Sequence, residues 1–288
     1  MLVSGPPEQT RATTAVRYTE YTPPPPLSSI VGCLWTLDGH ASEADAVPQL
    51  ILPDGRPELV VHFGDPFERV EPDGAAWRQP TVIFAGQLTG PLLLRPTGRI
   101  SVLGVRFHPD GAAGLITAPQ HDLAGLTIGV DSVSAPLAHA LRGIRESAGS
   151  LADAARAVED CLIERCDLSR IDPRVRHVVD DIRRFHGSLA VGELARRAGL
   201  TRRHLERRFK DVVGVSPKRL ARITRFRRAR RMLERLTSAR PGTLTAVTCG
   251  YADQAHFIRE FREFTGCAPT AHAMGGAELS GFFDSGPE

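Results

Sequence analysis

The side chains best suited to chemistry in this sequence of 288 residues lie in two short segments of its last third. In the segment 202–213, Leu205, Phe209 and Val212 recur at helical spacing, which predicts a buried stripe along one side of a helix. The opposite face carries charged side chains: Arg202, Arg203, Glu206, Arg207 and Lys210. Because a guanidinium group is a planar fork that fits phosphate and guanine, this face suits the binding of a polyanion.

The second segment, which ends at Gly266, repeats this design with aromatic residues. Phe257, Phe261 and Phe264 form its predicted buried stripe. The residues expected to lie largely outward are Gln254, Ala255, Ile258 and Arg259.

The charge of the chain is divided unevenly. Residues 173–275 contain 23 lysine and arginine residues against nine acidic ones, a net charge of +14, whereas residues 1–172 have a net charge of −8. A basic module joined to an acidic part points to a polyanion partner. Charge alone leaves other interpretations open, since basic domains also bind RNA, membranes or acidic proteins and can simply be solvated.

Two glycine turns place these segments after shorter helices. Gly199 and Gly250 are expected to supply the left-handed residue that ends the preceding helix. Thr201 and Asp253 are expected to cap the helix that follows. A short helix, a glycine turn and a second helix with a polar outer face describe a helix-turn-helix unit, whose second helix enters the major groove of DNA.

A long helix is predicted between the two units, from Ser216-Pro217 to about Leu236. About 21 residues at about 1.5 Å each make it about 31 Å long, which is close to one turn of B-DNA, about 34 Å. Two recognition helices held at that distance would enter successive major grooves on one face of a duplex.

In the part of the chain before this module, the apolar residues recur with a different spacing. Between residues 27 and 108, short apolar runs alternate with proline and glycine turns, a pattern typical of antiparallel sheets. A helix is expected to start at Pro109, and two amphipathic helices are expected at 133–147 and 151–166. The predicted fold class is therefore α+β: a β-rich, barrel or sandwich-like domain with helices, followed by an all-α double helix-turn-helix domain.

The spacing of apolar residues and the net charge both change along the chain, and these changes divide it into four expected parts. Residues 1–16 are polar and expected to be disordered, and residues 276–288 form a flexible acidic tail. Residues 17–170 form a sensor or dimerisation domain, and residues 173–275 form the DNA-binding domain.

The segment 188–271 resembles the DNA-binding domain of the AraC/XylS family of transcription regulators along its whole length. The most specific part is GYADQAHFIREF at 250–261, followed by Gly266 and Pro269; the first unit fits from Leu194 to Pro217. One departure is Thr245, where the family mostly has an aliphatic residue. Because this weakens the helix before Gly250, we expect the first unit to make the more dependable base contacts.

The resemblance implies which residues touch double-stranded DNA. By matching position, base contacts fall on Arg203, Glu206, Arg207, Gln254, Ala255, Ile258 and Arg259. The wider set of expected DNA-binding residues adds Arg202, Lys210 and Lys218. Arginine suits guanine, glutamine suits adenine and glutamate suits cytosine, although several of these side chains could equally hold phosphates.

The N-terminal half is similar to the sensor domains of a group of AraC-type regulators, around LPDG at 52–55 and LRPTG at 94–98. This resemblance implies a small-molecule effector or a homodimer, and contact with RNA polymerase at a promoter. It names no ligand, operator or direction of regulation.

The alternative is an enzyme or a metal-binding β-barrel sensor for which DNA binding is secondary; a third interpretation is an architectural DNA binder without sequence preference. His62 and His108 end apolar runs, but metal-ligand spacing is lacking, so we expect no metal, no cofactor and no enzymatic activity. Five scattered cysteines and the lack of a signal peptide or long apolar run predict a cytoplasmic protein with no membrane partner.

Overall fold

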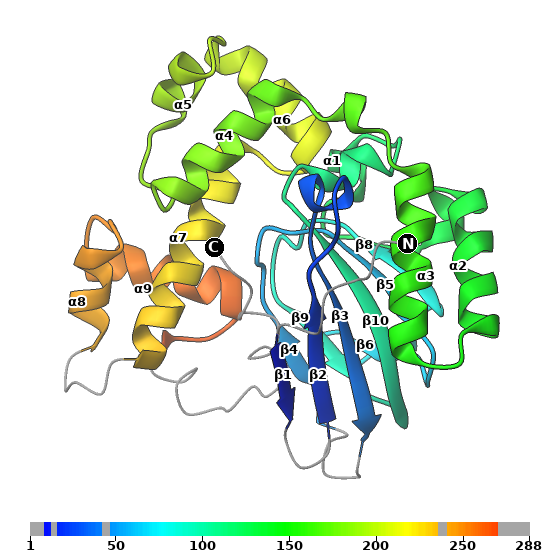
Figure 1. The fold of residues 1–288 in the computed structure, drawn as a ribbon. Helices are drawn as coiled ribbons and strands as arrows, with labels where there is room; N and C mark the ends of the chain where they lie inside the picture. The colour runs from blue at the N-terminus through cyan, green and yellow to red at the C-terminus, as the bar shows by residue number, and fades with distance from the viewer. Residues whose placement is uncertain (1–8, 13–15, 42–46, 236–240, 270–288) are drawn as a thin grey trace.

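The structure is a computed structural model that describes residues 9–12, 16–41, 47–235 and 241–269. A β-rich domain comes first, and the helices after residue 172, drawn in yellow-green to orange, lie above it and on its left (Figure 1). The predicted α+β class is confirmed. The expected disorder of 1–16 is wrong for Gln9–Ala12, which form strand β1 and pair with the next strand. The predicted tail 276–288 lies outside the described residues.

The larger of two antiparallel sheets has the strand order β1-β2-β3-β10-β5-β8-β11. After β1, its strands are β2 (Val16–Tyr21), β3 (Val31–His40), β5 (Glu58–His62), β8 (Val82–Ala85), β10 (Arg99–Phe107) and β11 (Thr127–Gly129). Successive side chains of a strand point to opposite faces of a sheet. In β5, Leu59 and Val61 therefore join the core on one face, whereas Glu58, Val60 and His62 line a cavity on the other.

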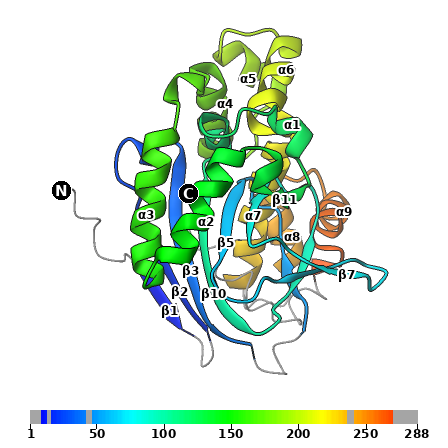
Figure 2. The ribbon, with the colours of Figure 1, turned by 90° about the vertical axis from the view of Figure 1, so that its right-hand side faces the viewer.

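The smaller sheet has the strand order β4-β9-β6-β7. Its strands are β4 (Gln49–Ile51), β6 (Glu68–Val70), β7 (Ala76–Arg78) and β9 (Leu92–Arg95). Ile51 and Leu94 pack against Trp35, Val60 and Ile83 of the larger sheet, so the two sheets face each other as a sandwich. Figure 2 shows β7 reaching away from this sandwich.

The opposite face of the larger sheet is covered by α2 (Ala135–Ser147) and α3 (Leu151–Arg165), as Figures 1 and 2 show. Both helices begin at a serine cap and turn an apolar side toward the sheet, which matches the two amphipathic helices predicted there. The helix expected at Pro109 is instead a single 3-10 turn, Gly111–Gly114. The remaining short elements are η1 (Leu27–Ser29), α1 (Gln120–Leu123), η4 (Val130–Ser132) and η5 (Leu168–Arg170).

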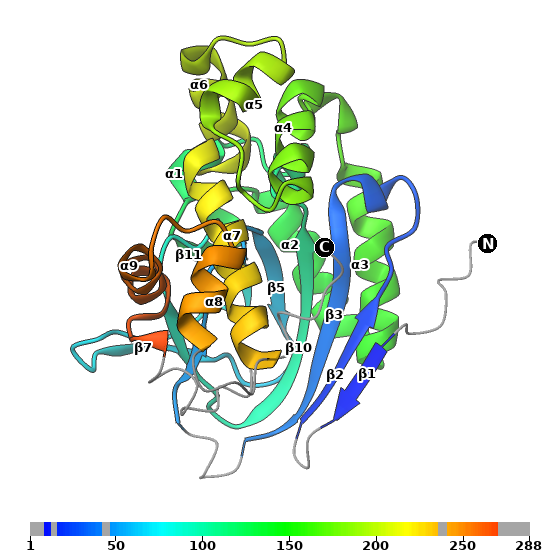
Figure 3. The same cartoon turned by 90° about the vertical axis from the view of Figure 1, so that its left-hand side faces the viewer.

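The C-terminal domain consists of helices in the described residues (Figure 3). They are α4 (Pro173–Arg184), α5 (Val191–Arg197), α6 (Arg202–Val213), α7 (Pro217–Arg235), α8 (Pro241–Thr248) and α9 (Gln254–Thr265). The two recognition helices predicted from apolar spacing are α6 and α9, and the predicted linker helix is α7. The additional helix α4 precedes the first unit and packs against α5, α6 and α7.

Candidate DNA interface and ligand cavity

The first recognition helix, α6, is positioned by a cap and an aliphatic core. The hydroxyl of Thr201 accepts a backbone hydrogen bond of 3.3 Å at its start. Leu205, Phe209 and Val213 are fully buried, whereas Val212 is only partly buried, so the buried stripe ends one residue later than its spacing predicts. Because these side chains face the core, the opposite side of α6 faces outward.

The second recognition helix, α9, is positioned by a cap and an aromatic core. Asp253 accepts a backbone hydrogen bond of 2.6 Å at its start. Phe257, Phe261 and Phe264 are fully buried. The ring of Phe226, from the linker helix, lies 5.4 Å from that of Phe261 and 5.0 Å from that of Phe264, measured between centroids. The linker helix and the second unit therefore share one core.

A buried carboxylate also ties α9 to the linker helix. Glu260 is 2% exposed, and its Oε2 lies 2.7 Å from Nε of Arg222 and 3.1 Å from Nη2 of Arg225. The more exposed Glu263 pairs with Arg222 as well. Sequence reasoning missed Glu260; the signal is its place beside Phe257 and Phe261 on the inward side of the helix.

The expected DNA contacts differ in exposure. Eight of them are exposed: Arg202 and also Arg203, Arg207, Lys210, Lys218, Gln254, Ala255 and Arg259. The Nε of Arg202 lies 3.0 Å from Oε1 of Glu206, so these two side chains pair along α6. Ile258 is only partly exposed, because it packs against the aromatic core of the second unit. The turn residues Gly199 and Gly250 have φ angles of 65° and 75°, in the left-handed region expected of them.

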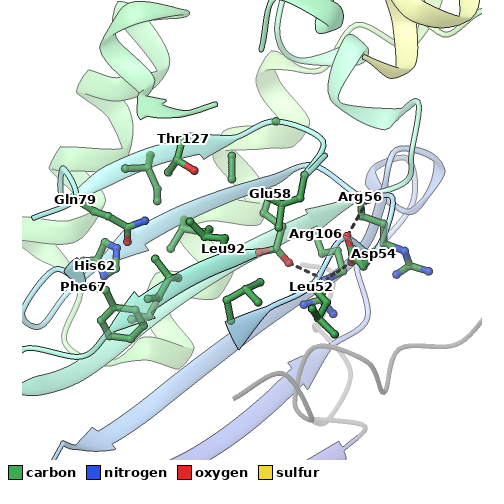
Figure 4. A pocket seen from close by; sticks show the side chains of 18 residues that line it. Leu52, Asp54, Arg56, Glu58, His62, Phe67, Gln79, Leu92, Arg106 and Thr127 are labelled. Carbon is green, nitrogen blue, oxygen red and sulfur yellow. Dashed lines mark hydrogen bonds and ion pairs between the residues drawn. The ribbon is translucent and has the colours of Figure 1, made fainter. Parts of the chain in front are cut away.

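A cavity lies between the two sheets of the N-terminal domain (Figure 4). The space among its lining atoms, counting the part open to solvent, is about 820 Å³. Most of its wall is apolar, with side chains such as Leu52, Val60, Phe67 and Leu92. A mostly apolar cavity with a few polar groups at fixed positions is typical of a small-molecule site.

Charged groups are concentrated at one end of this cavity. Arg106 is 1% exposed, and its Nε lies 2.7 Å from Oε1 of Glu58 and 3.8 Å from Oδ2 of Asp54. Burial raises the pKa of Glu58 above its usual range, although the neighbouring guanidinium of Arg106 acts in the opposite direction. This end therefore offers carboxylate oxygens beside a fixed cation in a dry environment.

A neutral histidine lies on the other side of the cavity. His62 is 1% exposed, and burial lowers its pKa to about 4, so the imidazole is uncharged at neutral pH. Figure 4 shows Gln79 and Phe67 beside it. His108, the other histidine singled out in the sequence, does not line this cavity; its Nε2 lies 3.2 Å from the carbonyl oxygen of Ser28.

The cavity wall extends into the contact with the linker helix. Leu52 lines the cavity and also packs in the core formed by α7, α8 and α9. Gly55, two residues after Pro53, lies so close to α7 that an added Cβ would come within 2.7 Å of Leu220 Cδ1. Arg227 of α7 donates a hydrogen bond of 3.3 Å to the carbonyl oxygen of Asp54. The segment from Leu52 to Arg56 is therefore shared between cavity and linker helix.

The first helix-turn-helix unit also contacts the N-terminal domain. Helix α6 packs against α1 and the turn Gly111–Gly114. Asp211 of α6 lies 3.3 Å from His121 of α1, and Arg176 of α4 pairs with the buried carboxylate of Asp110. The outward residues Arg203 and Arg207 stay exposed in this arrangement.

Comparison with known protein families gives two matches, one in each half of the chain. Residues 194–273 match the family described as a helix-turn-helix domain, and residues 19–129 match a domain of unknown function, DUF6597. No curated protein matches the sequence.

Several solved structures are similar to parts of the chain. The DNA-binding domain of AdpA, a global transcriptional factor solved with a target DNA, is 28% identical over 36% of this chain and 91% of that chain, with a TM-score of 0.32. A transcriptional regulator with an AraC-type DNA-binding domain from Chromobacterium violaceum is 24% identical over 35% of this chain and 90% of that chain, with a TM-score of 0.32. ToxT from Vibrio cholerae is 13% identical over 84% of this chain and 98% of that chain, with a TM-score of 0.43.

The match at 194–273 and the two capped recognition helices place this chain in the class of DNA-binding transcription regulators. Its C-terminal domain is an AraC-type helix-turn-helix domain, which confirms the resemblance seen in the sequence.

Two further observations concern other classes of site. Within the described part of the chain, no three histidine, cysteine, aspartate or glutamate side chains come together in a way that could hold a metal ion. Among the helices of the same residues, none combines the length and the apolar character needed to cross a bilayer.

Proposed function

We propose that the two recognition helices read double-stranded DNA in successive major grooves. The observation that carries this proposal is that α6 leads into the linker helix α7 and α9 packs beside α7 through Phe226 and Glu260, while most of the outward residues of both helices are exposed. The linker helix α7 has 19 residues, so it is about 28 Å long at about 1.5 Å per residue. That length is close to the rise of one DNA turn, about 34 Å.

In this arrangement, Arg203, Arg207 and Arg259 are the side chains best placed for guanine. Gln254 suits adenine, and Lys210 suits phosphate because ammonium is a compact point charge. Glu206 reads cytosine only by leaving its ion pair with Arg202, so we assign this pair a weaker role. Ala255 and Ile258 offer apolar contact with thymine methyl groups, and Lys218 a phosphate contact.

Selection of bound fragments from a random DNA library with the full chain tests this function. We expect two short conserved blocks about 10 base pairs apart, one for each recognition helix. A single block would leave one unit without a reading role. Recovered fragments with no common motif would favour an architectural DNA binder and contradict the proposal.

We further propose that the N-terminal cavity binds a small-molecule effector. Support comes from Leu52 and Asp54, which line the cavity and also meet the linker helix. A ligand that displaces this wall would alter the spacing or docking of the two units. Its expected chemistry is a mainly apolar body with one hydrogen-bonding group near Glu58 and another near His62.

A thermal-shift screen of small molecules, followed by DNA titrations with each hit, tests the effector site. Hits that bind the cavity should be lost in the variant His62→Leu and kept in His108→Leu, which changes a partly buried histidine outside the cavity. Loss in both variants, or in neither, would contradict binding at this site. By thermodynamic reciprocity, a true effector and DNA must change each other's affinity by the same factor.

The remaining partners follow from the family resemblance. We propose contact with RNA polymerase at a promoter and self-association through the N-terminal domain as routes by which binding is turned into regulation. Sedimentation of the purified chain with and without DNA measures the self-association. No catalytic role is assigned to the cavity, and a reaction catalysed by the purified chain would overturn that assignment.

A further inference from the structure

Four residues form a row across the larger sheet, at the charged end of the cavity between the two sheets. The strand register places Glu58 of β5 opposite Arg106 of β10 on one side and opposite Ala85 of β8 on the other. Ala85 in turn lies opposite Thr127 of β11. Directly opposite residues share one face of an antiparallel sheet, and all four line the cavity. Because the side chain of Ala85 is a single methyl group, it leaves space between the carboxylate of Glu58 and the hydroxyl of Thr127.

Carboxylates outnumber the guanidinium group that they surround at this end. Besides Glu58 and Asp54, Glu20 approaches Arg106, with its Oε1 3.9 Å from Nη1. The Arg106 side chain is 1% exposed, whereas those of Glu58 and Asp54, which line the cavity, are 20% and 16% exposed. A ligand in the cavity therefore meets carboxylate oxygens before it meets the guanidinium group.

The other arginine at this end, Arg56, directs its charge elsewhere. Figure 4 shows its guanidinium group on the far side of Asp54 from Glu58. Its Nη1 lies beside Gly32 of β3, 3.3 Å from the position of a Cβ added there. The carboxylates that face the cavity are therefore not covered by this second guanidinium group.

The two carboxylates at the cavity repel each other. Burial raises the pKa of Glu58, and the charge of Asp54 acts in the same direction, against that of Arg106. A carboxylate has about four acceptor positions, so both groups can accept hydrogen bonds beyond those from Arg106 and from the backbone of Arg56. A cation bound beside them would relieve the repulsion and use these acceptors.

The cavity also holds polar groups that lack a hydrogen-bond partner in the part of the chain that the structure describes. One is Oγ1 of Thr127, which is buried. The others are the ring nitrogens of His62, which form no well-aligned hydrogen bond, although Gln79 lies close enough to oppose part of the fall in the pKa of the ring. Leaving such buried groups unpaired costs free energy that polar atoms of a ligand would recover. Glu58 and His62 are four residues apart in β5, so their Cα atoms are about 13 Å apart.

We propose that the ligand of this cavity is an organic amine whose protonated amino group donates hydrogen bonds to Glu58 and Thr127, and whose apolar body extends along β5 toward His62. Asp54 adds attraction at longer range. This inference rests on the proposed effector site and assigns the charge and the length of its ligand. An ammonium group has three N–H donors and a positive charge, so it suits this end, whereas a carboxylate head group would meet like charge.

Calorimetric titration of the full chain with three ligands of equal chain length tests the assignment. Octylamine, 1-octanol and octanoate differ in their head groups, which are cationic, neutral and anionic at pH 7. We expect octylamine to bind at least about tenfold more tightly than 1-octanol, and octanoate to bind most weakly, because hydrogen bonds between charged groups are the strongest. Equal or tighter binding of 1-octanol or octanoate overturns the amine assignment, as does a lack of octylamine binding.

DNA titrations with the same ligands separate this inference from the effector role. Octanoate or 1-octanol that binds more tightly than octylamine and changes DNA affinity would overturn the amine assignment and leave the effector role intact. Octylamine that binds with the expected preference but leaves DNA affinity unchanged would support the amine site and contradict the effector role.

Matched carboxylate variants locate the amino group. Asp54→Asn removes a charge at the cavity, while its amide oxygen can still accept the backbone N–H of Arg56. It should weaken octylamine binding about threefold or more, with little change for 1-octanol. Asp38→Asn removes an exposed carboxylate of β3 that does not line the cavity, and this control should bind octylamine as the unchanged chain does. Equal losses in the two variants would reveal a general attraction of cations to an acidic domain and overturn the assignment.

Two further variants test the hydrogen bonds. Glu58→Gln should weaken octylamine binding about tenfold or more and remove most of its preference over 1-octanol. Thr127→Val replaces the hydroxyl by a methyl group and leaves Arg106 its partner, so it provides the test should Glu58→Gln not fold; we expect a loss of about threefold or more. Unchanged octylamine affinity in Glu58→Gln, or in Thr127→Val where the first variant does not fold, overturns the assignment.

Discussion

The two helix-turn-helix units share one plan but have different neighbours. The first unit packs against the N-terminal domain, where α6 meets α1 and Asp211 pairs with His121. The second unit meets that domain through Leu50 and Leu52 and is tied to the linker helix by its aromatic core and Glu260. The same motif is therefore supported in one case by another domain and in the other by the helix that precedes it.

This difference suggests how a signal reaches the DNA-binding surface. A movement of the N-terminal domain acts on α6 through α1 and the turn Gly111–Gly114, whereas it reaches the second unit through Leu50 and Leu52 and through α7. The two units should thus respond unequally to changes in the N-terminal domain. The predictions below test this contrast, from the largest expected effect to the smallest.

The glycines that end the two recognition helices give the sharpest comparison. Gly214 after α6 and Gly266 after α9 have φ angles of 91° and 78°, so alanine at either position costs about 1–2 kcal/mol. A Cβ at Gly214 would also lie 2.8 Å from the backbone oxygen of Gln120, whereas no atom of the residues that the structure describes lies within 4 Å of one at Gly266. We expect Gly214→Ala to destabilise the chain by about 3 kcal/mol or more and Gly266→Ala by about 1–2 kcal/mol.

Chemical denaturation of the two variants measures this difference. Proteolysis near α1 should also become faster in Gly214→Ala alone, because the docking of α6 is disturbed. Equal destabilisation would mean that the contact between α6 and the N-terminal domain is not tight.

The buried carboxylate of the second unit provides the next test. In Glu260→Gln, the guanidinium groups of Arg222 and Arg225 both lose their ion pair with this buried carboxylate, and Arg222 keeps its pair with the more exposed Glu263. The side chains of Arg222 and Arg225 are 25% and 15% exposed. We expect a loss of about 2–3 kcal/mol, which is less than for a fully buried pair because solvent screens the arginines.

Glu263→Gln is the matched control on the same helix. Its side chain is 44% exposed, so we expect a loss below about 1 kcal/mol in the same denaturation experiment. A control loss as large as that of Glu260→Gln would argue that burial of the carboxylate is unimportant.

Base reading by the two units is compared through Arg207→Ala and Arg259→Ala. Each variant should relax preference at one base position, in different halves of the binding site, by about 1–3 kcal/mol. Competition binding with single-base variants of the selected DNA measures this. Uniform weakening on all sequences would identify the mutated arginine as a phosphate contact.

Acid should affect the N-terminal domain and, through it, the first unit. Burial lowers the pKa of His62 and of His108 to about 4, whereas an exposed histidine titrates near 6.5. Because the unfolded chain then takes up protons before the folded one, stability falls as pH is lowered from about 6.5 to 4. We expect about 1–2 kcal/mol from each histidine by pH 5, partly offset by Glu58, whose raised pKa acts in the opposite direction.

Urea titrations at pH 7 and pH 5 measure this loss, and His62→Gln should reduce it. Hydrogen exchange should show α6 losing protection before α9 as pH falls. Simultaneous loss in both helices would contradict the contrast between the units.

The helical domain could be predicted in detail because its determinants are local. Caps at Thr201 and Asp253 and apolar spacing in α6 and α9 are readable from a dozen residues each. The position of Glu260 was missed because a carboxylate in the middle of a helix has no local mark of burial. Strand β1 was missed because its residues show no apolar alternation.

The sequence alone determined that two capped helices with polar outer faces come before and after a long linker helix in the chain, since hydrogen bonding and side-chain spacing within a helix are local properties. Only the tertiary structure decided that Leu52, Asp54 and Arg56 meet helix α7 and that His62 and Glu58 share one cavity. Those contacts join residues far apart in the chain. Their pairing depends on the order of strands in the sheets and the packing of whole domains, which no short stretch of sequence specifies.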